Sequence, residues 1–379
     1  MTTTPLLLVA FLCAAGGWAL LVFVPSVAGR VGAGGLGLVA AGIGGGIGLP
    51  YAAKVGVSVT TVAACTLLTA GVALLVASAV VLAHDVHGWS RLGVVVAVTV
   101  TSYLVLSTVG IAVAATNVPH VSLGDATPAD YDLDYRDVTF RATDGVELSG
   151  WYVPSSNGDA VVLLHGAGST RSAVLDHAAV LARAGYGVLL FDARGHGESS
   201  GRAMDFGWYG DRDVNGAVEF LTQQPDVGDG RILAVGLSMG GEEAIGAAAS
   251  NPRLCGVVAE GVTGRTAADH AWLSSAYGIR GFGQEVLDRF TYGFVDLLTP
   301  ASPPTSLRHA VEEMAPRRVL LIAARRVESE PHAADHIAAG AHRRVEVWVA
   351  PGAGHGNALE ARQSEWIDRV TKFLAAAPC

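Results

Sequence analysis

The stretch Arg231-Ile-Leu-Ala-Val-Gly-Leu-Ser-Met-Gly-Gly-Glu-Glu-Ala-Ile245 contains an apolar run, a Gly-x-Ser-x-Gly turn and a helix-forming run. This order predicts a buried strand, a sharp turn and a helix. Glycines at positions 236 and 240 let the strand and the helix approach closely, so the Ser238 hydroxyl would stand exposed above the edge of a sheet. The backbone amide of Met239 would lie at a helix N-terminus, which favours negative charge. The stretch therefore predicts a serine placed for nucleophilic attack.

Charge is distributed unevenly along the 379 residues. Residues 1–117 contain four charged side chains and carry +2, so with a net charge of −9 the rest of the chain carries −11. We interpret the first third as a membrane region and the rest as a soluble region. An acidic soluble region without a basic cluster gives no reason to expect nucleic-acid binding. The four cysteines form neither a disulfide framework nor a metal-ligand spacing, so they do not fix the cellular compartment.

Three uncharged apolar runs in the first third are long enough to cross a bilayer. They cover Pro5 to Val24, Val55 to Ala83 and Leu92 to Thr116. At about 1.5 Å per residue, 20 residues match a hydrocarbon core of about 30 Å. The first run lacks the basic N-terminal segment of a signal peptide and other apolar runs follow it, so a retained helix is favoured. No ionisable residue lies in the middle of a run, which argues for an anchor rather than an ion pathway.

Residues 31–50 are uncharged but rich in glycine. Their spacings Gly42-x-x-x-Gly46 and Gly44-x-x-x-Gly48 are typical of closely packed membrane helices. We therefore expect four membrane helices within residues 1–117, with three as the alternative. In the four-helix arrangement Arg30 and Arg91 lie on one side of the membrane and Lys54 lies on the other with the catalytic domain, so loop charge leaves the orientation open.

The remaining chain reads as a linker followed by an α/β domain. Residues 118–136 form the predicted linker, and the domain covers residues 137–376. It opens with a hairpin around the turn Asp144-Gly145. Continuous apolar runs then alternate with helical patterns, which predicts a mostly parallel sheet covered on both faces. The predicted strands cover 160–164, 187–191, 256–259, 318–322 and 344–349, together with the apolar run that precedes the Ser238 turn.

Four motifs follow the predicted strands of this domain. They are His165-Gly-Ala-Gly168, Asp192-Ala-Arg-Gly-His-Gly-Glu-Ser199, Gly236-Leu-Ser-Met-Gly240 and Gly354-His355-Gly. This order resembles the α/β-hydrolase superfamily, and within it the group of serine aminopeptidases, acyl-peptidases and esterases. The resemblance implies a helical lid, at about 261–317, between the strand after the nucleophile turn and the next strand. The membrane region lies outside the resemblance.

The resemblance also implies the partners of the nucleophile. A histidine in the loop after the last strand acts as general base, and His355 occupies that position. A carboxylate that orients this histidine usually follows the preceding strand. Glu328 lies closest to that offset and is our choice. Glu330 is the second candidate, and Glu260, after the strand that follows the nucleophile turn, is the third.

The oxyanion hole would combine two backbone amides. One belongs to Met239 and the other to Ala167, which follows His165-Gly166. We expect His165 and Asp192 to brace loops rather than to take part in catalysis, because both lie at turns where a side chain can bond to nearby backbone.

The predicted lid is rich in aromatic residues. They are Trp272, Tyr277, Phe282, Phe290, Tyr292 and Phe294. Two interpretations have equal weight: the aromatic side chains form a small core of the lid, or some of them line an acyl or apolar pocket. His332 and His336 have a helical spacing that suits a metal, but no third ligand accompanies them, so a surface helix is favoured.

These features predict a membrane-anchored, multi-pass serine hydrolase that cleaves an ester or amide through an acyl-enzyme. We expect no metal and no cofactor. The partners expected are a small-molecule ester or peptide and membrane lipid, without nucleic acid. A peptidase or aminopeptidase is the alternative among enzymes. A non-catalytic α/β-hydrolase-like binding protein is the alternative from another class.

Overall fold

The computed structural model describes residues 3–202 and 205–379 and divides the chain into two compact units. The first contains the chain up to Pro119 together with Val286–Pro300, and the second contains His120–Glu285 and Ala301–Cys379. The two units are described separately.

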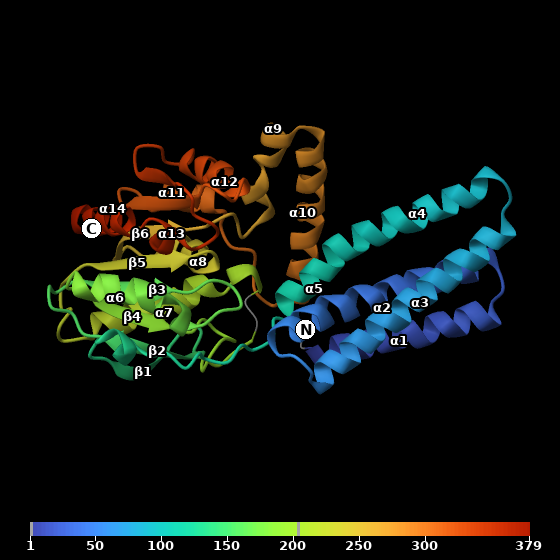
Figure 1. Ribbon diagram of the computed structural model, residues 1–379, viewed down its shortest axis with the longest axis horizontal. Coiled ribbons are helices and arrows are strands. Elements are labelled where there is room, and N and C mark those ends of the chain that lie inside the picture. The colour runs from blue at the N-terminus through green and yellow to red at the C-terminus, as the bar shows by residue number, and fades with distance from the viewer. Residues whose placement is uncertain (1–2, 203–204) are drawn as a thin grey trace. The chain divides into compact units, whose positions relative to one another are not determined.

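The second unit is built on one eight-stranded sheet (Figure 1). The strands lie in the order β1-β2-β4-β3-β5-β6-β7-β8. β1 and β4 are antiparallel to β2, and all other neighbours are parallel. Their bounds are Arg136–Arg141, Glu147–Val153, Ala160–Leu164, Gly187–Phe191, Ile232–Leu237, Leu254–Glu260, Arg318–Ala324 and Val345–Ala350. The predicted hairpin and the mostly parallel sheet are therefore confirmed.

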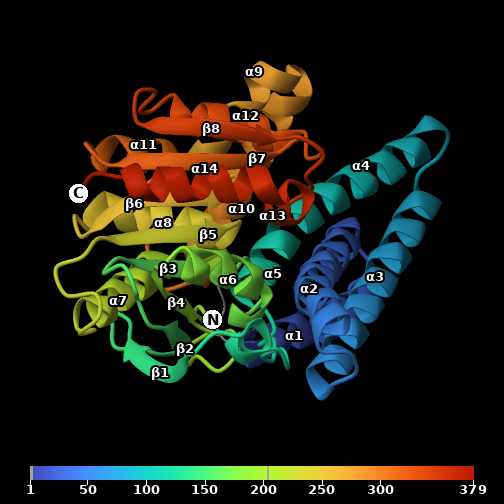
Figure 2. The ribbon, with the colours of Figure 1, turned by 60° about the vertical axis from the view of Figure 1, so that its left-hand side comes forward.

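Helices cover both faces of this sheet (Figure 2). One face packs against α7, α8, α11 and α12, and the other packs against α6, α13 and α14. Their bounds are Gly210–Thr222, Met239–Ser250, Leu307–Glu313 and Ser329–Ala338, and then Leu175–Arg183, Ala358–Ala361 and Gln363–Ala376. Short 3₁₀ turns lie at Pro128–Tyr131 (η2), Arg171–Val174 (η3), Asp205–Gly207 (η4) and Ala267–His270 (η5).

The central strands are apolar on both faces because both faces are covered. In β3, Val162 and Leu164 point to one core, whereas Val161 and Leu163 point to the other, and all four are buried. Burying one such side chain contributes about 1.5–3 kcal/mol. The β3, β5 and β6 strands therefore form a rigid platform whose carboxyl ends carry the candidate site.

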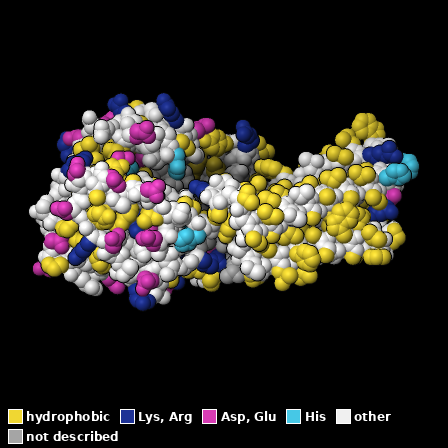
Figure 3. All heavy atoms as spheres, turned by 60° about the horizontal axis from the view of Figure 1, so that its bottom comes forward, with side chains coloured by type: hydrophobic (Ala, Val, Ile, Leu, Met, Phe, Trp, Pro, Cys, Tyr) yellow, Lys and Arg dark blue, Asp and Glu magenta, His cyan; other side chains and the backbone are white. Residues whose placement is uncertain are grey.

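The first unit contains four long apolar helices. α1 spans Thr3–Phe23, α2 spans Val27–Lys54 and α3 spans Val59–Asp85. α4 (Trp89–Val105), a π-turn η1 (Leu106–Gly110) and α5 (Ile111–Thr116) continue as one helix. Each of the four is long and apolar enough to cross a membrane. Apolar side chains dominate the surface of this unit, whereas the other unit carries many charged side chains (Figure 3).

Glycine explains why the weakly apolar α2 packs as a helix. A Cβ at Gly44 would lie 2.5 Å from the backbone nitrogen of Leu68, and one at Gly46 would lie 2.6 Å from the carbonyl oxygen of Gly110. Only glycine permits such close backbone approach. The predicted role of Gly44 and Gly46 in helix packing is confirmed, whereas Gly42 has no contact closer than 3.9 Å.

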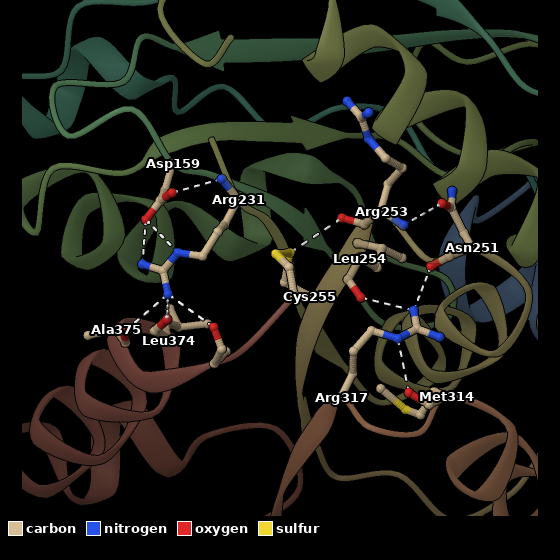
Figure 4. The surroundings of a disulfide bond; sticks show 12 residues. Asp159, Arg231, Asn251, Arg253, Leu254, Cys255, Met314, Arg317, Leu374 and Ala375 are labelled. Atoms are coloured by element: carbon tan, nitrogen blue, oxygen red, sulfur yellow. Dashed lines mark hydrogen bonds and ion pairs between the residues drawn. A yellow bond between two sulfur atoms is a disulfide. The ribbon is translucent and has the colours of Figure 1, made fainter. Parts of the chain in front are cut away.

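A disulfide bond joins Cys255, in β6, to the last residue, Cys379 (Figure 4). Our expectation that the cysteines form no disulfide framework is therefore wrong. The pairing was hidden because the two residues are 124 positions apart in the sequence and meet only in the folded chain. Arg231 also holds this tail, because its guanidinium donates to the carbonyl oxygens of Leu374, Ala375 and Ala377 at 3.0–3.1 Å.

The segment between β6 and β7, where a lid was predicted, contains η5, α9 (Leu273–Tyr277), α10 (Ile279–Leu298) and α11. The second half of α10 belongs to the first unit. There Thr291 Oγ1 donates to the carbonyl oxygen of Ser107 at 3.5 Å, and Leu298 packs against the apolar cluster of α1, α2, α3 and α5.

Candidate active site

Ser238 lies at the turn between β5 and α8, as predicted. Its backbone has φ 51° and ψ −123°, a conformation that L-residues rarely adopt and that costs on the order of 1–3 kcal/mol. The surrounding structure enforces it: Ser238 N–H donates to the carbonyl oxygen of Glu260 at 2.6 Å. A Cβ at Gly236 would lie 2.4 Å from Gly240, and one at Gly240 would lie 2.6 Å from the His165 carbonyl oxygen. Both glycines of the motif are therefore required by close backbone approach.

The loop after β3 lies directly against this serine. A Cβ at Gly166 would be 3.3 Å from Ser238 Cβ. Ala167, the next residue, is exposed, and Met239 begins α8. The residues expected to supply the two oxyanion amides thus lie in the loop and the helix that flank Ser238. Their role stays a prediction.

Two buried histidines hold this loop. His165 Nε2 accepts from Ala193 N–H at 3.0 Å, so its Nδ1–H donates to the Gly166 carbonyl oxygen at 2.8 Å. His196 Nε2 accepts from Gly168 N–H at 3.2 Å. Burial lowers the pKa of both rings, that of His165 to about 3, so they act as neutral donors and acceptors. His165 is a bracing residue as predicted, and His196 was missed although it stands in the quoted motif after β4.

Asp192 braces the same region. It is fully buried, and its carboxylate accepts from the backbone N–H groups of Arg171 and Glu198 and from the Arg171 guanidinium at 2.6–3.0 Å. A Cβ at Gly197 would lie 2.0 Å from Asp192 Oδ2, so glycine is required there. The predicted bracing role of Asp192 is confirmed. Its partner Arg171, also buried, was not predicted.

His355 lies in the loop after β8 and is half-exposed. Its Nδ1–H donates to Glu330 Oε1 at 2.7 Å. The other oxygen, Glu330 Oε2, accepts from Ala324 N–H at the end of β7, also at 2.7 Å. The Glu330 side chain is fully buried and therefore fixed at both oxygens. Because one side of the His355 ring is occupied in this way, Nε2 is left as the proton acceptor.

The structure corrects the choice of carboxylate from Glu328 to Glu330. Glu328 is exposed, and among the described residues the carboxylate that bonds to His355 is that of Glu330. α12 begins at Ser329, so the two glutamates are separated by two positions on helical backbone and point in nearly opposite directions. Pro331 was the overlooked signal, because proline fits the first turn of a helix and places Glu330 inside that turn.

Glu260, the third candidate, has a structural role. Its two carboxylate oxygens accept from Ala358 N–H at 2.7 Å and from Trp366 Nε1–H at 3.0 Å. Burial raises the pKa of this carboxyl group, and these two hydrogen bonds oppose the shift. Glu260 therefore ties the end of β6 to α13 and α14 and does not contact His355 through a hydrogen bond.

The end of β6 brings the serine and histidine loops together. Ser238 N–H bonds to Glu260, and the next residue, Gly261, has φ +70° and lies against the His355 ring. A Cβ at Gly261 would be 3.2 Å from His355 Nδ1. Within residues 3–202 and 205–379 no hydrogen bond joins Ser238 Oγ to His355; such bonds are often long in ligand-free sites.

Electrostatics around His355 favour its protonated form. The hydrogen bond and the charge of Glu330 raise the pKa of His355, partial burial lowers it, and the charges of Glu242 and Glu260 raise it further. The net direction is upward from 6.5. A developing imidazolium is therefore stabilised in place.

A cavity of about 500 Å³ borders the residues next to the serine and the histidine. Leu237 and Gly356 form part of its lining, together with His177, Asn357 and Leu359. Its lining is both polar and apolar and includes the chain neighbours of Ser238 and His355 rather than these two residues themselves.

The aromatic residues of the predicted lid divide into two sets. Trp272 and Tyr277 pack together at 5.9 Å, and Trp272 stacks on His332 at 5.4 Å. Phe282 and Phe290 are exposed. A small core therefore exists in α9, but not along α10. Among the described residues, His332 and His336 belong to no group of three ligands that could hold a metal.

The second unit has the α/β-hydrolase fold, as the sheet order and the position of the turn after β5 indicate. The sequence model of the family described as serine aminopeptidase, S33, matches residues 155–287. An esterase of Pyrococcus furiosus has a similar structure, with a TM-score of 0.54 and 28% identity. That similarity covers 69% of this chain and 97% of the esterase.

Two curated relatives match a shorter segment. The chain is 38% identical to an uncharacterised protein of Mycobacterium tuberculosis over 120 residues, and this segment is 31% of the chain. It is 39% identical to a thiohydrolase of Aspergillus aculeatus over 132 residues, and this segment is 34% of the chain. In both cases the match spans 42% of the relative's length.

Proposed function

We propose that this protein is a serine hydrolase that works through an acyl-enzyme. The observation that carries the proposal is the hydrogen bond between Glu330 and His355, in a loop that borders the strained Ser238 turn. A buried carboxylate, an oriented imidazole and a half-buried hydroxyl at a helix N-terminus are the groups that nucleophilic acyl transfer requires.

In the proposed mechanism His355 Nε2 takes the proton from Ser238 Oγ as the oxygen attacks the substrate carbonyl carbon. The backbone N–H groups of Met239 and Ala167 stabilise the resulting oxyanion. Glu330 stabilises the imidazolium without taking its proton. His355 then protonates the leaving group, and a water molecule, activated by the same histidine, releases the acid.

The bond cleaved is proposed to be an ester or a thioester. The names of two relatives, an esterase and a thiohydrolase, favour these over a peptide bond. The matched family description, serine aminopeptidase, keeps a peptidase as the second candidate. A panel of acyl esters, acyl thioesters and aminoacyl amides distinguishes them by kcat/KM. A binding protein without activity would turn over none of them and would not react with a fluorophosphonate probe.

We propose further that α1 to α4 anchor the enzyme in a membrane as a multi-pass protein. Exposed residues of these helices include Leu8, Phe11, Val80 and Val96, which would face water in a soluble protein. Exposing apolar surface to water costs roughly 25 cal/mol per Å² in free energy, and contact with lipid removes that cost.

The anchor predicts a clear fractionation result. The full-length chain should stay in the membrane pellet after carbonate at high pH and after high salt, because apolar burial does not depend on charge. Mild detergent should release it. The control is a matched wash of a peripheral membrane protein from the same cells. Release of the full-length chain by carbonate alone would contradict a spanning anchor.

A further inference from the structure

α10 exposes four large apolar side chains on one narrow face. Ile279 is 87% exposed, Phe282 57%, Phe290 59% and Leu297 77%. With 3.6 residues per turn, these positions fall within an arc of about 80°. Their regular placement along a helix of 20 residues distinguishes them from scattered surface residues. We call these four residues the α10 stripe.

From Val286 onward, where α10 belongs to the first unit, its other side is packed on the long apolar helices. Val295 is fully buried, Thr291 bonds to Ser107 in η1, and Leu298 contacts the apolar cluster of these helices. Exposed charged residues border the stripe on both sides, Arg280 on one and Arg289 and Asp296 on the other. An apolar face between charged flanks is typical of a helix that lies at a membrane surface.

The surface next to the Ser107 contact is also apolar. Leu104 and Ile111, on the helix that includes Ser107, are 43% and 47% exposed. If this helix crosses a bilayer, its exposed apolar side chains contact lipid. Within the first unit, Phe290 and Leu297 of the stripe extend this apolar surface along the helix segment that Thr291 joins to Ser107. The continuity favours a lipid surface as its occupant over a soluble protein.

We propose that α10 lies in the membrane interface with the α10 stripe against lipid, and that the enzyme takes amphiphilic acyl esters or thioesters from the bilayer. This inference rests on the proposed function. α10 directly follows α9, whose Tyr277 packs against His332 on α12. α12 also carries Glu330, the carboxylate that orients His355.

The contact with lipid is tested on the full-length chain in phosphatidylcholine nanodiscs that hold one copy each. Cys13 and Cys65 are replaced with serine, and an environment-sensitive fluorophore is attached to Phe290→Cys or to Asp296→Cys. We expect the label at 290 to be shielded from aqueous iodide and the label at 296 to be quenched. Equal quenching would overturn the proposal. Shielding only in discs with two copies would assign the stripe to a second copy and would also overturn it.

The substrate class is tested by kinetics on the same preparation. Phe282→Ser combined with Phe290→Ser should raise KM about tenfold or more for a long-chain ester incorporated in the nanodisc bilayer. Hydrolysis of a short, water-soluble ester should not change. The control, Arg280→Ser combined with Asp296→Ser, should change neither. Equal losses on both substrates would overturn the proposal. Iodide shielding without hydrolysis of any ester would refute the proposed function and leave the lipid contact standing.

An independent observation bears on the orientation in the membrane. The C-terminal tail is held by hydrogen bonds from Arg231 and by the disulfide from Cys255 (Figure 4). The two Cα atoms of the disulfide are 4.4 Å apart. Disulfides persist in oxidising compartments and are rare where thiols are kept reduced. Loop charge does not decide the orientation, because Arg30 and Arg91 lie on one side and Lys54 on the other, so the disulfide alone carries the inference.

We infer that the catalytic domain lies on the oxidising, non-cytoplasmic side of the membrane. There the thiols of Cys255 and Cys379 lose two protons and two electrons to the disulfide of a thiol oxidoreductase, which becomes a dithiol. Loops at Gly88 and Ser26 lie on the opposite side in the four-span arrangement.

The orientation is tested in membranes acidified at once to preserve thiol states. In the Cys13→Ser, Cys65→Ser background, a polymer-linked maleimide should attach to no thiol without reductant and to two after reduction. Alkaline phosphatase fused after Cys379 should be active, and the same reporter fused at Gly88 should be inactive. Two reactive thiols without reductant, or the reverse reporter pattern, would overturn the inference. Release by carbonate would instead refute the anchor.

Discussion

Ser238→Ala should abolish covalent labelling by a fluorophosphonate and lower kcat by about 10⁵–10⁶-fold, the scale seen when the nucleophile of a serine protease is removed. The reason is that His355 and Glu330 assist the attack on the substrate carbonyl, whereas the Ser238 oxygen is the atom that makes it. Binding and the oxyanion amides would remain, so a residual rate above that of water is expected. Labelling with a tagged probe and turnover of a short ester measure the two effects.

The substitution should leave the fold intact. Alanine keeps the Cβ, so it neither relieves nor adds backbone strain at φ 51°. Ser250→Ala, at the other end of α8, is the matched control and should label like the unaltered protein. Both variants should show unchanged thermal unfolding. Retained labelling in Ser238→Ala would show that another residue is the nucleophile.

Continuous apolar runs made the sheet predictable. Residues 160–164 and 187–191 were expected as strands and form β3 and β4 with the same bounds. Such runs have to be buried on both faces, and in a chain of this length only a covered parallel sheet meets that need. The turn at Ser238 was predictable because glycine at 236 and 240 is a local steric requirement.

Contacts between distant segments were not predictable from local patterns. The pairing of Cys255 with Cys379 depends on the path of the last helix, and the role of Arg171 depends on the burial of Asp192. The choice between Glu328 and Glu330 depends on where α12 begins, because a shift of two helical positions reverses the direction of a side chain. Boundaries of elements therefore decide which of two neighbouring residues reaches a site.

Glu330→Gln should lower kcat on the order of 10⁴-fold, as loss of the corresponding carboxylate does in a serine protease. Glu330 accepts two hydrogen bonds, from His355 Nδ1 and from Ala324 N–H, whereas glutamine offers one oxygen and one NH₂ group. If the oxygen stays on Ala324, the NH₂ group faces Nδ1 and places the ring proton on Nε2. That tautomer cannot accept the proton of Ser238.

The pH profile separates this positioning role from a general loss of folding. His355 acts as a base only when neutral, so activity rises with pH through its pKa, which the hydrogen bond to Glu330 raises above 6.5. Glu330→Gln removes the largest cause of that shift, so the acidic limb of kcat/KM should move to lower pH. The control, Glu328→Gln, should cost less than about tenfold, or 1.4 kcal/mol, with an unchanged profile. Full activity in Glu330→Gln, or a larger loss in Glu328→Gln, would refute the assignment of Glu330.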